Sequence, residues 1–549
     1  MQRFSLNRFD RAHLRGDLAG GITAGIVALP LALAFGVASG AGPIAGLYGA
    51  ICVGLFASLF GGTPTQISGP TGPMTIVAAA LFTQFGDRPA IAFTVVMLTG
   101  VFQVMFGVLR IGRYINLMPY PVISGFMTGI GGILIIMQLD PLMGFPSPSN
   151  VLNALTVLPD YLSHPNWGAV CIGVAALFLC LRTPPVIGRI VPPPLLALIV
   201  GSLAALFLFD VPVLGEIPSA LPMIIVPSID AALLKDMVAT AMVLAALGSI
   251  DSLLTSLVAD NATGRFHDSD KELVGQGLGN LVAGLMGGIP GAGATIRTLT
   301  NIQAGGRTAL SGVTHALLLL LIVACLGPVV AFVPHAALAG VLIKVGIDVI
   351  DWQFLKRAHR APRIDLFLMI VVFILTVFVD VITAVGIGIV LASLAFVKQA
   401  ADVQMKSIRS ISEPDSEVLF SEEEAALFRQ VQTSVQFVHL SGLMSFGAAN
   451  EMARRFAALG GYEVLILDLL DVPGIDGSAG LELEELIQRA ISSGHEVVII
   501  GVRYPVAKVL TQLGSLELVK ESQRFGSRRE GLEAALRIIE ARSKSQATG

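Results

Sequence analysis

Charged residues are scarce in this sequence. Of its 549 residues 13% are charged and 54% are hydrophobic, and the mean hydropathy is +0.78. Soluble globular domains carry about 25% charged residues, so a wholly soluble chain is excluded. The net charge of −4 gives no reason to expect a nucleic-acid partner.

Cysteines and nucleotide-binding motifs are also few or missing. The four cysteines all lie in apolar runs, and none forms a CxxC pair, which excludes a disulfide framework or a cysteine metal site. There is no GxxxxGK phosphate-binding loop and no nucleophile–base pattern, so we expect neither an ATPase nor another enzyme, and no cofactor. No apolar core precedes Gly16, so a cleavable signal peptide is not expected.

The few charges are unevenly distributed, and this divides the chain. Long apolar runs fill residues 16–400, whereas the later residues are charged and mixed. We expect an N-terminal segment over 1–15, a transmembrane domain over 16–400, a linker over 401–416 and a soluble domain over 417–549.

Fourteen apolar segments are candidates for membrane spans, since a spanning helix needs about 20 apolar residues. Lys and Arg gather in alternate loops, which predicts a cytoplasmic N-terminus and tail in a multi-pass protein of the cell inner (plasma) membrane. The segments are 17–38, 43–60, 72–85, 91–109, 117–139, 166–182, 193–209, 236–258, 273–288, 294–304, 309–332, 334–350, 364–380 and 382–400.

Helix-breaking residues interrupt the third and the tenth segment. Residues 69–74 read GPTGPM and residues 288–297 read GIPGAGATIR, and a short apolar stretch follows each. With seven spans per half, this is the pattern of inverted-repeat transporters, whose broken helices form the binding site. Two half-helix N-termini aimed at one point favour an anion. The alternative is that both stretches are re-entrant packing elements.

Two charged residues lie within apolar segments. Asp251 has Thr255 one turn later on the same helix face, and together with backbone carbonyls of 291–295 they would offer oxygen ligands to a small cation or a proton. Arg297 lies at the start of the tenth segment, where a guanidinium would strengthen an anion site. The alternatives are a structural ion pair for Asp251, and a snorkelling or ion-paired Arg297, for which Asp251 itself is a candidate partner.

Several long stretches resemble the SulP family of anion transporters and exchangers. They are GDLAGGITAGIVALPLALAFGVASG, PTQISGPTGPM, SGFMTGIG, ELVGQGLGN with GGIPGAGAT, and AVGIGI. The resemblance covers nearly the whole chain. It implies an all-helical membrane domain of fourteen spans in a seven-plus-seven inverted repeat, with core and gate domains. It also implies a homodimer and a C-terminal STAS domain of the α/β class.

The resemblance also implies roles for particular residues. In sodium-dependent bicarbonate transporters of the family, a cation site corresponds to Asp251, Thr255, Gly293 and Thr295, so Na+ is a possible coupling ion. An anion site corresponds to Thr71, Ala294 and Thr295.

Two positions depart from the bicarbonate-transporting pattern. Gly69 stands in place of a Glu, and Arg297 stands in place of a small residue. Many members that handle sulfate or chloride have an Arg at this second place. Sulfate or another small anion therefore stays open as the substrate.

The tail alternates strand-like and helix-like runs, which indicates an α/β sandwich. The strand-like runs are 433–440, 463–470 and 496–502, and the helix-like runs are 445–459, 478–493 and 505–514. The loop DVPGIDGSAG resembles the STAS signature, with Asp476 and Ser478 as the matching residues. Ser478 is either a regulatory phosphorylation site, with a cytoplasmic regulator as a possible partner, or the N-cap of the following helix, which we favour.

The favoured function is secondary active transport of a small inorganic anion, bicarbonate first and sulfate next, coupled to Na+ or H+. Alternating access would take place around a site at the membrane midplane. The alternatives are an anion channel or exchanger, or a regulatory membrane protein centred on the STAS domain. A nucleobase or dicarboxylate transporter is disfavoured, because no Glu lies between Glu216 and Glu272 or between Glu272 and the tail.

Overall fold

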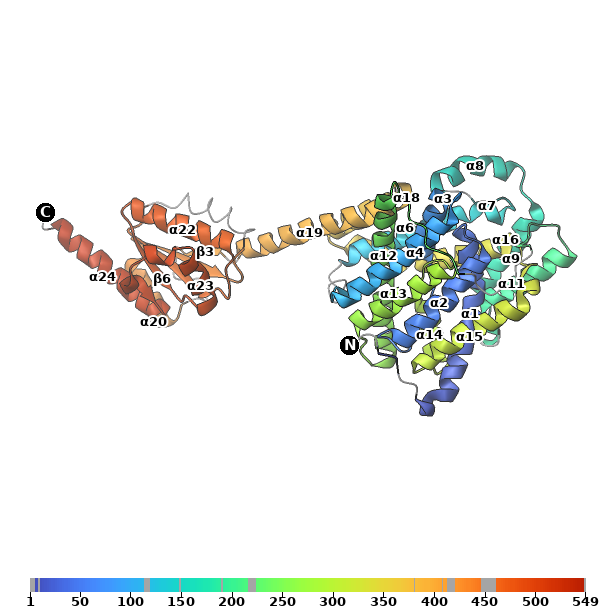
Figure 1. Cartoon of the computed structure of the whole chain (residues 1–549). Helices are drawn as coiled ribbons and strands as arrows, with labels where there is room; N and C mark the ends of the chain where they lie inside the picture. The colour runs from blue at the N-terminus through green and yellow to red at the C-terminus, as the bar shows by residue number, and fades with distance from the viewer. Residues whose placement is uncertain are drawn as a thin grey trace. The chain divides into compact units, whose positions relative to one another are not determined.

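The protein divides into two compact units, residues 1–390 and 391–549 (Figure 1). This computed structural model describes residues 5–7, 10–112, 119–147, 150–188, 191–215, 224–379, 381–406, 408–411, 420–445 and 461–547. The two units are described separately below.

The first unit is built from helices, and each of the fourteen predicted segments overlaps one of them. Proline at the first or second position starts α2, α3, α4, α6 and α11, where its missing N–H costs no hydrogen bond. The helices are α1 (Leu14–Ala38), α2 (Pro43–Phe60), α3 (Gly72–Gln84), α4 (Pro89–Val108), α6 (Tyr120–Met137), α9 (Trp167–Arg182), α11 (Pro193–Phe207), α12 (Leu234–Thr263), α13 (Ser269–Leu285), α14 (Thr295–Gln303), α15 (Ala309–Val330), α16 (His335–Val349), α18 (Arg363–Phe378) and α19 (Val381–Lys406).

Shorter helical pieces connect these helices. They are η2 (Arg11–His13), α7 (Leu139–Leu142), α8 (Val151–Ser163), α10 (Pro185–Gly188), α17 (Trp352–Arg357) and η3 (Ala358–Arg360). No predicted segment covered α8, which meets α9 at a bend of 118°.

Five helices of the described chain are long and apolar enough to cross a membrane, or six if α8 and α9 are counted as one bent span. These five are η2 with α1, α2, α4, α6 with α7, and α12, while α3, α11 and parts of α15 and α19 are shorter apolar helices. A polytopic helical membrane domain is therefore the architecture of this unit.

Glycine lets α4 and α13 approach closely. A Cβ atom on Gly100 would lie 2.4 Å from the carbonyl oxygen of Gly277, and one on Gly277 would lie 2.6 Å from that of Gly100. Small residues at such crossings are typical of helix packing in membranes, where van der Waals contact replaces the hydrophobic effect.

The two helix-breaking stretches meet in the middle of this unit. Strand β1 (Ser68–Gly69) pairs antiparallel with strand β2 (Ala292–Gly293), with Ser68 opposite Gly293 and Gly69 opposite Ala292. Each strand leads into a short helix, α3 after β1 and α14 after β2. We call the paired strands the crossing. Non-helical backbone is tolerated at membrane depth only where it is buried in protein or lines a cavity.

The second unit is a five-stranded sheet in the order β3-β4-β5-β6-β7, in which only β3 and β4 are antiparallel. Its strands are β3 (Ile408–Ile411), β4 (Val435–Ser441), β5 (Val464–Asp471), β6 (Glu496–Ile500) and β7 (Arg524–Phe525). Its helices are α20 (Glu422–Val431), α22 (Gly477–Ser492), α23 (Tyr504–Gln512) and α24 (Arg528–Ala547), with short turns η4 (Leu516–Leu518) and η5 (Glu521–Gln523).

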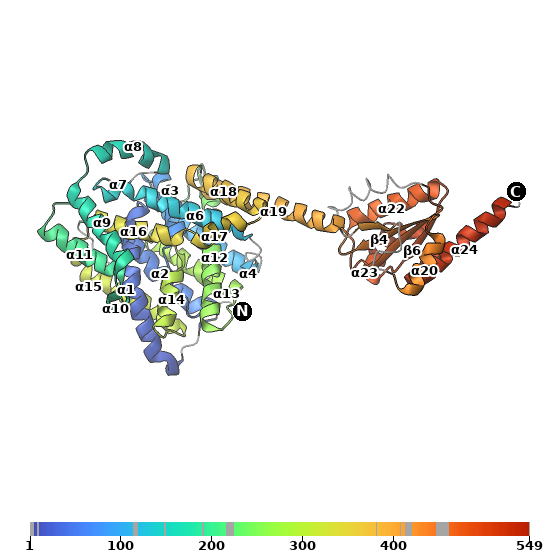
Figure 2. The ribbon, with the colours of Figure 1, turned by 180° about the vertical axis from the view of Figure 1, so that it is seen from behind.

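Helices cover both faces of this sheet (Figure 2). Side chains of α22 and α23 share one apolar core with the sheet, and those of α20 and α24 share the other. The predicted α/β sandwich is confirmed.

Two details differ from the prediction or fall outside it. Residues 401–416 are not simply a linker, because they contain the end of α19 and the edge strand β3, which pairs with β4. Most of the helix predicted over 445–459 lies outside the described residues.

Candidate ion-binding site

A cavity of about 270 Å³ lies beside the crossing. Of the seven residues predicted for the two ion sites, six line it and one, Thr255, lies buried behind it. The lining comes from α1 (Leu31, Phe35), the start of α3 (Thr71, Gly72, Pro73), α6 (Met127), α12 (Asp251), β2 and α14 (Gly293, Ala294, Thr295, Ile296, Arg297) and α16 (Val345, Asp348, Val349).

Two helix N-termini open into this cavity. Thr71 is the N-cap of α3 and Ala294 is the N-cap of α14, and both have extended backbone. Neither side chain caps its own helix. The first amide groups of both helices are therefore available to an anion, and the helix dipoles favour one there.

Asp251 is half-buried and faces the same cavity. Its Oδ2 accepts a hydrogen bond of 2.7 Å from the hydroxyl of Thr71. Among the described residues, no nitrogen of Lys, Arg or His lies within 4.0 Å of the carboxylate. The alternative of a structural ion pair with Arg297 is therefore wrong for the described structure, although the guanidinium is near enough for its charge to act on Asp251.

Three of the four residues predicted for the cation site contact one another. The hydroxyl of Thr255 lies 2.8 Å from that of Thr295 and donates to the carbonyl oxygen of Gly293 at 3.0 Å. Asp251, the fourth residue, lies one turn before Thr255 on α12, and its bonded partner is Thr71. A carboxylate, hydroxyls and a carbonyl are the hard oxygen donors that suit a small cation.

Arg297 is the charged residue nearest the start of α14, and it is 1% exposed. One terminal nitrogen donates to the carbonyl oxygen of Pro70, while the other, NH1, is buried without a partner among the described residues. A Cβ atom on Gly69 would lie 2.8 Å from NH1. The two departures from the bicarbonate-transporting pattern are thus neighbours in space, since Gly69 leaves the room that the guanidinium occupies.

Polar side chains of α12 and α13 hold the crossing from behind, and the sequence reasoning missed them. The amide group of Asn280 bonds both the N–H and the carbonyl of Gly291, at 2.7 and 2.9 Å. The hydroxyl of Ser252 accepts from the N–H of Gly293 at 3.0 Å. The signal was present in the spacing, because Glu272, Gln276 and Asn280 recur every four residues and so share one helix face.

Sequence profiles of two known families match this chain. The profile of the sulfate permease family covers residues 14–372 and that of the STAS domain covers residues 429–528. The chain belongs to the sulfate permease family. Its expected class is thereby confirmed, a membrane transporter with a STAS domain and not an enzyme.

Known members include close relatives of the chain. The bicarbonate transporter BicA of Picosynechococcus is 44% identical over 505 residues, which is 90% of this chain and 89% of the relative. YvdB of Bacillus subtilis, named as a sulfate transporter, is 30% identical over 88% of this chain and 90% of its own length.

Solved structures agree with this assignment. The transmembrane domain of a cyanobacterial BicA matches with a TM-score of 0.65 and 48% identity, over 69% of this chain and all of that domain. Murine solute carrier 26 family member A9, in an inward-facing state, matches with a TM-score of 0.83 over 96% of this chain and 92% of its own. Its identity of 18% makes that second likeness one of fold alone.

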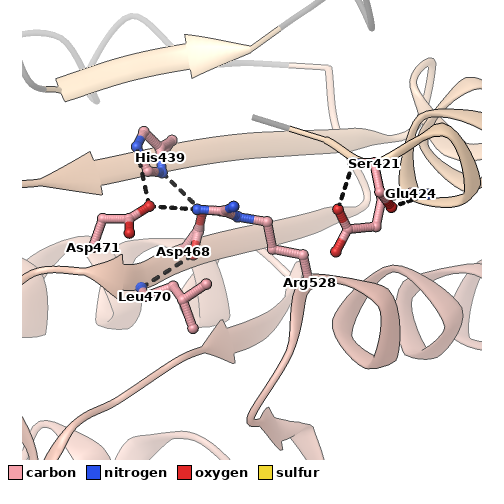
Figure 3. Close-up of polar contacts among 7 residues, drawn as sticks. All are labelled: Ser421, Glu424, His439, Asp468, Leu470, Asp471 and Arg528. Carbon is pink, nitrogen blue, oxygen red and sulfur yellow. Dashed lines mark hydrogen bonds and ion pairs between the residues drawn. The ribbon is translucent and has the colours of Figure 1, made fainter. Parts of the chain in front are cut away.

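The second unit, residues 391–549, contains the STAS match and is called the STAS unit below. A cluster of charged residues lies in it where β4 and β5 end (Figure 3). Asp468 accepts hydrogen bonds from Nδ1 of His439 and from Nε of Arg528, each at 2.8 Å, and Arg528 also pairs with Asp471. Possible metal-ligand atoms of His439, Asp468 and Asp471 lie within 4.8 Å of one another, but the guanidinium of Arg528 already supplies positive charge there.

The protonation of this cluster follows from its contacts. Burial favours the neutral form of Asp468, but hydrogen bonds from His439, Arg528 and the Leu470 amide outweigh burial and lower its pKa below the ordinary value. Burial likewise opposes the charge of Arg528, but the hydrogen bonds and charges of Asp468 and Asp471 outweigh burial and raise the pKa of the guanidinium.

The capping box of Ser421 and Glu424 starts the neighbouring helix α20 (Figure 3).

The STAS signature loop lies just after β5. Asp476 is the N-cap of α22, and its carboxylate accepts from the N–H of Ala479 at 2.9 Å. Our favoured assignment of Ser478 as the cap is therefore wrong, because Asp476 occupies that position. Ser478 is the second residue of α22 and is exposed, so its hydroxyl is accessible at the N-terminal end of a helix dipole.

Proposed function

We propose that this protein is a secondary active transporter that carries bicarbonate inward together with sodium. The single observation that supports it most is that two half-helix N-termini and the unpaired carboxylate of Asp251 face one cavity. The relatives named BicA support bicarbonate as the anion.

The anion would bind at the starts of α3 and α14. The hydroxyl of Thr71 already donates to Asp251, so backbone N–H groups of both helices and the guanidinium of Arg297 would be the main donors to the anion. The sodium ion would bind beside Asp251, with the oxygens of Thr255, Gly293 and Thr295. The cation would offset the charge of Asp251, so the site would hold the anion more tightly when the cation is present.

Movement would proceed by alternating access. One wall of the cavity comes from α3, α12 and α14, which are tied together through the crossing, and the other comes from α6 and α16. Rocking of these walls against each other would open the cavity to one side of the membrane at a time. By the loop charges, the N-terminus and the STAS unit would be cytoplasmic in a plasma-membrane protein. The protein would form a homodimer, and a cytoplasmic regulator would act on the STAS unit near Ser478.

Sulfate is the second candidate substrate, and Arg297 is the observation that favours it. A buried guanidinium with a nitrogen that has no partner among the described residues would help to neutralise a divalent anion. YvdB, the relative named as a sulfate transporter, is consistent with this alternative.

The test is uptake of labelled bicarbonate and labelled sulfate into proteoliposomes that contain the full-length protein. We expect bicarbonate uptake to require an inward sodium gradient, and to persist when an ionophore removes any proton gradient. Asp251→Asn, which keeps the shape but removes the charge, is expected to reduce sodium-driven uptake to the background of empty liposomes. Undiminished sodium-driven uptake by this variant would refute the proposed cation site.

A further inference from the structure

A second acid, Glu272, is buried behind the crossing and belongs to neither proposed ion site. It lies in the first turn of α13 and is 1% exposed. Among the described residues, no cationic nitrogen lies within 4.0 Å of it. Burial of an uncompensated carboxylate is costly, so its retention calls for a specific role.

Three N–H donors surround this carboxylate. Oε2 accepts from the backbone N–H of Thr63 at 2.8 Å, and Oε1 accepts from the side-chain amides of Gln66 at 2.9 Å and Gln276 at 2.8 Å. A carboxylate is an acceptor at every lone pair, whereas an amide is not. Glu272 thereby fixes both glutamine side chains with their nitrogens toward it.

Each glutamine extends from Glu272 to one strand of the crossing. The nitrogen of Gln276 also donates to the hydroxyl of Ser68 at 2.6 Å. The amide of Gln66 covers Gly293 so closely that a Cβ atom on Gly293 would lie 2.3 Å from its nitrogen. Ser68 and Gly293 are themselves partners in the crossing.

The far side of Gln66 is held as well. Its oxygen accepts from the hydroxyl of Ser256 at 3.0 Å, and that hydroxyl lies 2.7 Å from the hydroxyl of Thr63. Ser256 directly follows Thr255 on α12, so the same network braces the helix that carries the proposed cation ligands.

We propose that Glu272 is a positioning residue for ion binding: through Gln66 and Gln276 it fixes Ser68 and Gly293, and so the carbonyl and helix starts that face the ions. This inference rests on the proposed function only for the identity of the ions. Groups that orient ligands from behind are typically worth about 10- to 100-fold in metal affinity or activity.

Glu272→Gln tests this role with little change of shape. If the new oxygen faces the two glutamines, its NH2 group meets the N–H of Thr63. If its NH2 group faces them, both glutamine amides must turn their oxygens toward it, and the hydrogen bond between Gln276 and Ser68 must reverse its direction. Either arrangement disturbs the network that holds the crossing. We expect the sodium concentration for half-maximal uptake, or the bicarbonate KM, to rise by about tenfold with the maximal rate largely retained.

Asp17→Asn is the matched control. Asp17 is also fully buried and also accepts three hydrogen bonds, from the N–H groups of Arg307 and Thr308 and from the Thr308 hydroxyl, but it shares no partner with the crossing. We expect Asp17→Asn to lower the thermal unfolding temperature without changing either half-saturation value. Equal shifts in both variants, or no shift in Glu272→Gln, would overturn the proposal.

Ser68→Ala provides a second measurement should Glu272→Gln fail to fold. It removes the acceptor at the far end of the Gln276 link and leaves Glu272 in place. We expect a smaller shift of the same half-saturation value, and unchanged values would count against the role. If wild-type uptake proves independent of sodium, the proposed coupling ion is wrong, but the bicarbonate KM of these variants still decides whether Glu272 positions the site.

Discussion

The two units of this protein treat a buried carboxylate in opposite ways. In the STAS unit, Asp468 is fully buried and holds both His439 and Arg528. In the first unit, residues 1–390, which we call the transport unit, Asp251 and Glu272 contact hydroxyl and amide groups. No cation lies at ion-pair distance from either acid among the described residues. The difference separates an acid that is ion-paired from two acids that make no ion pair among the described residues.

This contrast bears on whether Asp468 and Asp251 stabilise the fold or bind ions. A buried acid that forms an ion pair is part of the folded structure, and removing its cationic partner leaves an unpaired buried charge, which is destabilising. An acid in a membrane helix costs at least about 3 kcal/mol at the bilayer centre, and it is retained where it serves a ligand or an ion pathway. On this argument Asp468 is structural, and Asp251 is the acid that the proposed coupling ion would complete.

The largest effect is expected from removing Arg297, the cation near Asp251 in the transport unit. We expect Arg297→Gly to reduce sulfate uptake by at least about tenfold and bicarbonate uptake less, because a divalent anion depends more on the guanidinium. Labelled uptake of both anions by the variant measures this. Equal losses for the two anions would mean that Arg297 does not select between them.

Thr255→Val sharpens the contrast at the cation site. It keeps the shape of the side chain but removes the hydroxyl that bonds Gly293 and Thr295, so the sodium concentration for half-maximal uptake should rise by about tenfold. Thr263→Val is the control on the same helix, because among the described residues the Thr263 hydroxyl bonds only the Ala259 carbonyl of its own helix. A similar rise in both variants would argue against a specific role for Thr255.

Arg528→Met removes the arginine that is ion-paired with Asp468, so that Asp468, like Asp251 and Glu272, has no Arg or Lys partner among the described residues. It leaves Asp468 buried with His439 and the Leu470 amide but without the guanidinium, so we expect the free energy of unfolding of the STAS unit to fall by about 2–3 kcal/mol, somewhat less than for a fully buried pair. Denaturant titration of the full-length protein measures it. Arg529→Met is the control, since the ion pairs of Arg529 are exposed, and it should leave stability unchanged.

The smallest expected effect concerns acid pH. The pKa of Asp468 is lower in the folded protein than in the unfolded chain, so its stabilisation is full above the unfolded value of about 3.9 and is lost as the pH falls below it. Unfolding midpoints of the STAS unit should therefore drop on acidification through that range. Arg528→Met should show a weaker drop, and an identical pH profile in the variant would contradict this assignment.

The sequence predicted the helices well because their physical cause is local. Each of the fourteen apolar runs overlaps a helix, and Gly and Pro mark the two interrupted segments that form the crossing. Convergence of the breaks followed from the repeat, and the crossing confirms it. Proline and glycine act on their own backbone, so their positions alone carry this information.

Features that depend on distant partners were not predictable in the same way. Glu272 lies one residue before the predicted segment 273–288, yet it is buried, and Thr63 and Gln66, more than 200 residues earlier, supply two of its donors. The STAS cluster joins Asp468 to residues 29 and 60 positions away, through sheet order that composition does not reveal. The linker was misjudged for the same reason, since β3 is a strand only because β4 pairs with it.

The pairing of Ser68 and Gly69 with Gly293 and Ala292 has a consequence for energy conversion. Because the backbones of the two halves are paired with each other, we expect the starts of α3 and α14 to move together, so the spacing between the proposed anion and cation positions should be the same on both sides of the membrane. A fixed spacing means that attraction between the two cargoes is retained throughout the cycle. The ratio in which they cross would then be set by local chemistry at one place, and not by the timing of two separate moving parts.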